Sequence, residues 1–170
     1  GLLKSAIRDE DPVVFLESEK MYGDKGEVPE GEYLIPIGTA NIKRKGQHVT
    51  IVSFGKIIKI AEEVAEILAK ENIEIEIIDL RTIRPIDYGT IVESIKKTNR
   101  CVVVEESWPL ASISSEIAYH VQRYAFDHLD APVLRVTQTD TPLAFSPTLI
   151  EEALPSKEKL IDAIKHVLYA

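Results

Sequence analysis

The stretch Cys101-Val-Val-Val-Glu-Glu-Ser-Trp-Pro109 decides the fold class of this chain. It opens with an unbroken apolar run, Cys101–Val104, whereas a strand with one face in water alternates polar and apolar residues. The run therefore predicts a strand inside a parallel sheet that helices cover on both faces. Polar residues follow at once, and sites in such sheets gather where strands end and loops begin.

Strand and helix patterns alternate on both sides of this stretch. Helical spacing is clearest at 56–71, where charged residues take the face opposite the apolar one. Strands are predicted at 40–44, 48–54, 73–80, 101–104 and 133–137, and helices at 56–71, 87–97, 112–126, 147–153 and 156–168. This order predicts an α/β fold of three layers, α/β/α, with a mostly parallel sheet. The tight turn at 45–47 makes the first strand the candidate antiparallel member.

The first 38 residues do not fit this alternation. Residues 2–7 have the pattern of the end of an amphipathic helix, and residues 12–17 form a second apolar strand pattern. Neither piece can bury its own face, so we interpret 1–17 as the remnant of a preceding domain. Residues 18–38 hold glycine, proline and acidic residues, which is typical of a linker. We therefore expect a piece of a longer protein whose main domain is 39–170.

Composition excludes several classes of function. The chain has 170 residues, a net charge of −8 and 45% hydrophobic residues, so a nucleic-acid partner is not expected. No stretch is long and apolar enough to predict a membrane span. The single cysteine, Cys101, excludes an internal disulfide and a cysteine-rich metal site, and its apolar strand predicts a core thiol.

Taken from the residues alone, no catalytic constellation is evident. The turn Ser53-Phe-Gly55-Lys56 opens a helix, so it is either an ordinary turn or a weak anion site. Arg81 and Arg84 are predicted at the same sheet edge as the carboxylates 105 and 106, where a structural ion pair is favoured over substrate binding. Those adjacent carboxylates should point to opposite faces, which makes them a poor acid–base pair. The four histidines show no metal-ligand spacing.

Segments along the whole chain resemble the carboxyl-terminal part of the β subunit of the thiamine-dependent 2-oxo acid dehydrogenases. The matching segments are GLLKSAI (1–7), PVVFLE (12–17), MYG (21–23), IPIG (35–38), VTIV (49–52), LRTIRP (80–85), VVE (103–105), LDAPV (129–133) and RV (135–136). Trp108-Pro109 resembles the pyruvate dehydrogenase branch of that family. A branched-chain 2-oxo acid or acetoin enzyme, or a stand-alone interaction or anion-regulated domain, are the alternatives.

The resemblance implies a transketolase carboxyl-terminal fold with a five-stranded mixed sheet and one antiparallel strand. It implies a parent enzyme that decarboxylates a 2-oxo acid and passes the acyl group to a lipoyl domain. Thiamine diphosphate and Mg would be bound by the α subunit and by the amino-terminal half of the β subunit. This chain is therefore expected to bind neither, to be inactive alone, and to lie in the cytoplasm of a bacterium or in a mitochondrial matrix.

The resemblance also implies partners and the residues that meet them. The family forms an α2β2 enzyme, and Trp108 and Pro109 are the candidate anchors at a subunit interface. The subunit-binding domain of the dihydrolipoyl acyltransferase would dock at Asp130 and at the terminal carboxylate of Ala170. The alternative for Asp130 is that it only caps a turn. Residues 110–114 depart from the glycines common in relatives, so the contacts of this loop can differ.

Overall fold

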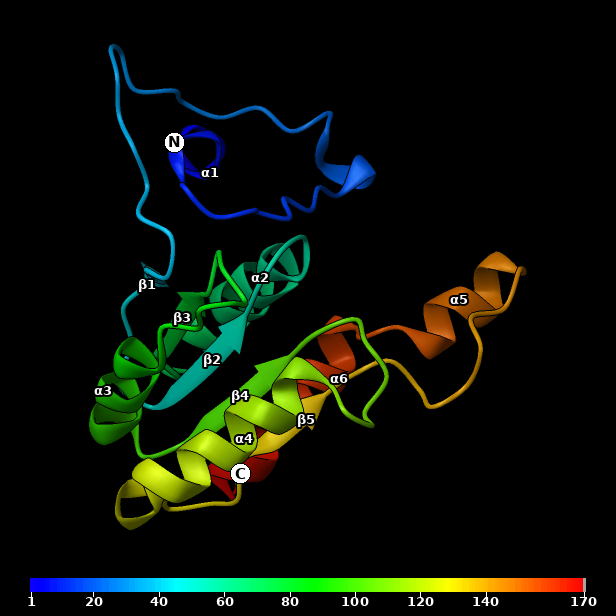
Figure 1. Ribbon diagram of the computed structural model, residues 1–170. Helices are drawn as coiled ribbons and strands as arrows, with labels where there is room; N and C mark the ends of the chain where they lie inside the picture. The colour runs from blue at the N-terminus through cyan, green and yellow to red at the C-terminus, as the bar shows by residue number, and fades with distance from the viewer. Residues whose placement is uncertain (170) are drawn as a thin grey trace.

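The computed structural model describes residues 1–169 and is built around a five-stranded sheet (Figure 1). The strand order is β1-β3-β2-β4-β5. The strands are β1 (Asn41–Arg44), β2 (Val49–Ser53), β3 (Ile75–Asp79), β4 (Cys101–Val104) and β5 (Leu134–Val136). β1 runs antiparallel to β3, whereas the other neighbouring strands pair in parallel. The predicted mostly parallel mixed sheet is confirmed.

Helices cover both faces of this sheet, which confirms the three layers. α2 (Ile57–Ala69) and α6 (Lys157–Leu168) pack on one face. α3 (Tyr88–Thr98) and α4 (Ile113–Tyr124) pack on the other. Each layer of helices encloses its own hydrophobic core against the sheet.

The strand β4 contributes side chains to both hydrophobic cores, as its unbroken apolar sequence predicted. Val102 and Val104 contact the core under α2 and α6, while Cys101 and Val103 contact the core under α3 and α4. All four side chains are fully buried. Burying one valine contributes roughly 1.5–3 kcal/mol, so a polar residue in this run would be costly. β4 lies between β2 and β5, and β2 is the middle strand of the sheet.

Side-chain caps fix where several helices begin. The carboxylate of Asp87 accepts a hydrogen bond from the backbone N–H of Thr90 at 3.1 Å, at the start of α3. Ser112 caps α4 and Ser156 caps α6 in the same way. These caps satisfy backbone donors that have no partner inside the helix, so the predicted helix starts are confirmed.

One prediction about the first strands is confirmed and another is wrong. β1 is antiparallel as predicted, and its partner is β3, although β2 follows it directly in the chain. The predicted strand at 12–17 does not form, and these residues are irregular among the described part of the chain. A strand needs a partner ladder, and the segment lies outside the sheet, so its apolar pattern alone does not make it a strand.

The remaining elements lie at the periphery, as Figure 1 shows. They are α1 (Leu2–Arg8), the short 3₁₀ helices η1 (Glu19–Met21) and η2 (Phe126–His128), and α5 (Pro147–Ala153), which projects from the body. An ion pair between Asp24 and Lys59 ties the amino-terminal segment to α2 at 2.5 Å. The division into 1–17, 18–38 and 39–170 stays a prediction. No helix within residues 1–169 is both long and apolar enough to cross a membrane.

Candidate functional site

Asp130 lies in the turn between η2 and β5, at the edge of the sheet where the parallel strands begin. Its backbone N–H donates to the carbonyl of Asn99 at 2.9 Å, and Asn99 Nδ2 donates to the carbonyl of His128 at 2.8 Å. The hydroxyl of Tyr169 donates to the Asp130 carbonyl at 2.8 Å. The backbone of this turn is therefore held by two other segments of the chain.

The carboxylate of Asp130 has one ion-pair partner and still reaches water. Arg100 Nη2 lies 3.1 Å from Asp130 Oδ2, and the Asp130 side chain remains 54% exposed. An exposed carboxylate fits a residue that docks a partner. If Asp130 only capped a turn, its carboxylate would accept hydrogen bonds from nearby backbone N–H groups instead. Ala170, the second residue of the predicted docking pair, lies outside the described residues.

Trp108 stands in the loop between β4 and α4, where the sequence placed an interface anchor. Its indole N–H donates to the carbonyl of Thr141 at 3.1 Å, yet the residue is 53% exposed. The neighbouring Leu110 is 82% exposed. The carbonyl of Pro109 accepts from Arg135 at 2.7 Å, which fixes the backbone of the loop. An exposed tryptophan on a fixed loop fits an interface anchor, and that role stays a prediction.

The two carboxylates after β4 do not pair with Arg81 or Arg84. Glu105 is buried and accepts a hydrogen bond from the backbone N–H of Ser114 at 2.7 Å, at the first turn of α4. Glu106 points the other way and pairs with Lys56 at 2.7 Å. The prediction that the carboxylates face opposite sides is therefore confirmed. The predicted ion pair with the two arginines is wrong, because nearer donors hold both carboxylates.

The turn Ser53–Lys56 has its polar groups engaged within the protein. The hydroxyl of Ser53 is buried and donates to the carbonyl of Val104 at 2.8 Å. Lys56 is neutralised by Glu106, and Gly55 takes the left-handed backbone that a turn requires (φ 64°). These contacts disfavour an anion site at this turn, and the anion site stays a prediction.

The described residues hold no cluster of metal-ligating side chains, and the thiol of Cys101 is buried. Burial raises the pKa of the Cys101 thiol to about 12, so it stays protonated and unreactive. Within residues 1–169 no group of three or more histidine, cysteine, aspartate or glutamate side chains could hold a metal ion.

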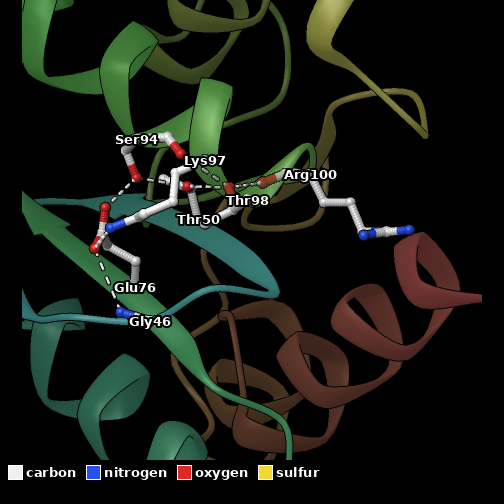
Figure 2. A network of polar contacts seen from close by, with 7 residues as sticks. All are labelled: Gly46, Thr50, Glu76, Ser94, Lys97, Thr98 and Arg100. Atoms are coloured by element: carbon white, nitrogen blue, oxygen red, sulfur yellow. Dashed lines mark hydrogen bonds and ion pairs between the residues drawn. The ribbon is translucent and has the colours of Figure 1, made fainter.

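Sequence reasoning missed a buried polar network centred on Glu76 in β3 (Figure 2). Glu76 is 1% exposed and accepts from the hydroxyl of Ser94 at 2.6 Å and from the backbone N–H of Gly46 at 3.3 Å. Lys97 completes its environment as an ion-pair partner. The signal was a glutamate between the isoleucines of a buried strand, because a buried charge requires partners.

The network continues along the sheet to the start of β4. The hydroxyl of Thr50 in β2 lies 2.6 Å from the hydroxyls of both Ser94 and Thr98. Thr98 also donates to the carbonyl of Arg100 at 3.2 Å, and Figure 2 shows the Arg100 side chain leaving the network toward a neighbouring helix. Every buried polar group in this chain of contacts has a partner, which makes the region rigid.

Comparisons with known proteins agree with this fold. The chain is 50% identical over 169 residues, 99% of its length, to "Pyruvate dehydrogenase E1 component subunit beta" of Rickettsia felis, of which it covers 52%. It is 48% identical to "Pyruvate dehydrogenase E1 component subunit beta, mitochondrial" of Dictyostelium discoideum, and the match covers 98% of this chain and 48% of that one. It is 46% identical to "Acetoin:2,6-dichlorophenolindophenol oxidoreductase subunit beta" of Cupriavidus necator, covering 99% of this chain and 50% of that one. The chain thus spans about half the length of these relatives.

A solved structure supports the same architecture. The structure described as "Split gene transketolase, inactive beta4 tetramer" superposes with a TM-score of 0.71 at 26% identity, covering 85% of this chain and 46% of that one. The family described as "Transketolase, C-terminal domain" matches residues 38–160, which include the whole sheet. The chain therefore belongs to the transketolase C-terminal domain family.

Proposed function

We propose that this chain is the carboxyl-terminal part of the β subunit of a pyruvate dehydrogenase decarboxylating component, where it serves assembly and docking. The observation that carries the proposal is the 50% identity to such a β subunit across 99% of the chain. The parent enzyme would oxidatively decarboxylate pyruvate and transfer the acyl group to lipoyl domains. Its compartment would be the bacterial cytoplasm or the mitochondrial matrix.

Exposed apolar side chains support the part of the proposal that concerns assembly. Thiamine diphosphate and Mg would be held by other parts of the enzyme, as the family resemblance implies. The exposed side chains of Trp108, Leu110 and Phe145 would meet other subunits, since large apolar side chains favour burial at interfaces. The proposed partners are the α subunit, a second β subunit, and the subunit-binding domain of the acyltransferase.

A chimeric subunit tests this proposal directly. In the chimera this chain replaces the matching residues of the Rickettsia felis β subunit, and the product is co-expressed with the cognate α subunit. We expect an α2β2 assembly by light scattering and pyruvate decarboxylation that depends on thiamine diphosphate. A control chimera carries the matching residues of the split-gene transketolase, which share the fold at lower identity. Failure of the first chimera to assemble, or equal performance by the control, would contradict the proposal.

An acetoin dehydrogenase β subunit is the second candidate, favoured by the 46% identity to the Cupriavidus necator protein. The same exchange in that β subunit separates the two candidates. A pyruvate dehydrogenase origin predicts better assembly and higher activity in the pyruvate chimera than in the acetoin chimera, each relative to its own parent. The reverse order would favour acetoin.

A separate titration tests whether the chain itself binds the cofactor. Thiamine diphosphate with Mg is added to the 170-residue chain in a calorimeter, and no saturable heat is expected. Saturable binding in the micromolar range would contradict the assignment of the cofactor to other parts of the enzyme.

A further inference from the structure

Arg100 lies where three distant segments of the chain meet. Its Nε donates to the carbonyl of Val167, in the last turn of α6, at 3.0 Å. Its Nη2 lies 3.1 Å from Asp130 Oδ2, in the turn before β5. One planar guanidinium thus joins the carboxylate of Asp130 to the carboxyl-terminal helix, which a lysine at this position could not do with the same geometry.

The backbone of Arg100 is fixed from the opposite side. Its carbonyl accepts the backbone N–H of Thr50 at 2.9 Å and the hydroxyl of Thr98 at 3.2 Å. Both partners belong to the buried network in Figure 2, which ends at the Glu76 carboxylate. The guanidinium therefore projects from a rigid base, and only 23% of the Arg100 side chain is exposed.

We propose that Arg100 is the positioning residue of the docking site, holding the Asp130 carboxylate in one orientation for a basic partner segment. The inference rests on the proposed docking function and deepens it. A carboxylate can accept several hydrogen bonds at once, so Asp130 can bind Arg100 from within and a lysine or arginine of the partner from outside. The half-exposed carboxylate is suited to such sharing.

Removing Arg100 has two opposing effects on a basic partner. Loss of a neighbouring positive charge strengthens the attraction between Asp130 and the partner. Loss of the guanidinium also frees the Asp130 side chain and its link to α6, so binding must then immobilise them. Water around the half-exposed Asp130 keeps the first effect small, at about 1 kcal/mol or less. We expect the second effect to exceed it, because both the Asp130 side chain and its link to α6 must then be ordered on binding.

The test uses the assembled α–β enzyme that contains this chain and a purified subunit-binding domain of a dihydrolipoyl acyltransferase. Binding is measured by surface plasmon resonance for wild type, Arg100→Met, Asp130→Asn and the double variant. We expect Arg100→Met to weaken binding about three- to ten-fold, the cost of ordering one freed side chain. Lys165→Gln is the matched control, because it removes one positive charge from the same end of α6 without touching Asp130. Thermal unfolding of each variant checks the fold.

The double variant separates positioning from a general structural role. If Arg100 acts through Asp130, Arg100→Met adds nothing to the loss caused by Asp130→Asn. The inference is overturned if Arg100→Met binds as well as Lys165→Gln, or if it weakens the Asp130→Asn enzyme as much as the wild type. Absence of binding by the wild-type enzyme would overturn docking itself, while the chimera experiment would still decide the family role.

Discussion

Replacing Gly46 by alanine should destabilise the protein strongly, because the turn between β1 and β2 crosses the backbone of β3 at that point. A Cβ on residue 46 would lie 2.2 Å from the carbonyl carbon of Ile75 and 2.3 Å from the nitrogen of Glu76. These atoms belong to backbone inside the sheet, so they cannot move aside as a flexible side chain can. The turn must instead move away from β3 by roughly 1 Å to restore ordinary van der Waals contact.

That displacement sets the size of the effect. The N–H groups of Gln47 and His48 donate to the carbonyl of Glu74 at 3.0 and 2.9 Å, and Gly46 N–H donates to Glu76 at 3.3 Å. A shift of roughly 1 Å takes all three beyond hydrogen-bonding distance. At about 1 kcal/mol for each bond, Gly46→Ala should lower the free energy of unfolding by about 3 kcal/mol. For a chain of this length, the melting temperature should fall by about 6–12 °C.

Urea unfolding followed by circular dichroism measures this change. An unchanged slope of the unfolding free energy against urea concentration indicates that the native fold is kept. Gly26→Ala is the matched control, because a Cβ there meets nothing within 4 Å. The control should stay within about 0.5 kcal/mol of wild type. A Gly46→Ala protein that is as stable as the control would refute the packing argument.

Further predictions concern buried and partly buried titratable groups. Glu76→Gln should lower the free energy of unfolding in urea by about 2–3 kcal/mol, because the amide removes the negative charge and turns a donor toward Lys97. Glu93→Gln, on the exposed face of α3, should lower it little. Equal losses in the two variants would contradict this reasoning. Cys101 should resist thiol reagents until the protein unfolds. Burial raises the pKa of Cys101 above 9.0, so the thiol loses its proton at a lower pH in the unfolded state than in the folded state. The free energy of unfolding should therefore fall above pH 9 by up to about 1.4 kcal/mol per pH unit, and this fall should be absent in Cys101→Ala. Burial lowers the pKa of His120, so an NMR titration should give a value below 6.5, and stability should fall as the pH drops through that range; a pKa above 6.5 would be inconsistent.

The fold could be predicted where local patterns and the global structure agree. The apolar run of β4, the two-sided pattern of α2 and the cap at Asp87 are short-range signals, and each leads to the element observed. The pairing of β1 with β3 could not be predicted, because the partners are brought together only by the crossover of α2. The prediction of a strand at 12–17 was wrong for the same reason, because a strand depends on a partner that the local sequence does not specify.

The candidate site was predictable only in part. Asp130 and Trp108 were chosen through the family resemblance, and the structure finds both exposed. Arg100 was missed because its partner Val167 lies 67 residues away in sequence. No local pattern marks an arginine in a turn as the link between two such distant groups. Glu76 carried a readable signal, a charge between the isoleucines of a buried strand, but its partners come from a helix and from a turn.

The polar groups at the two edges of the sheet differ in a way that is consistent with the proposed docking role of Asp130. Ligands of parallel α/β sheets usually bind where the strands end. At that edge Glu105 accepts from the first turn of α4, Glu106 pairs with Lys56, and Ser53 donates to the backbone, so these three groups are engaged within the protein. The opposite edge, where the strands begin, holds Asp130 half exposed on a rigid base. A carboxylate held in one orientation can guide and align a basic protein surface, so the proposed docking at Asp130 should depend on Arg100.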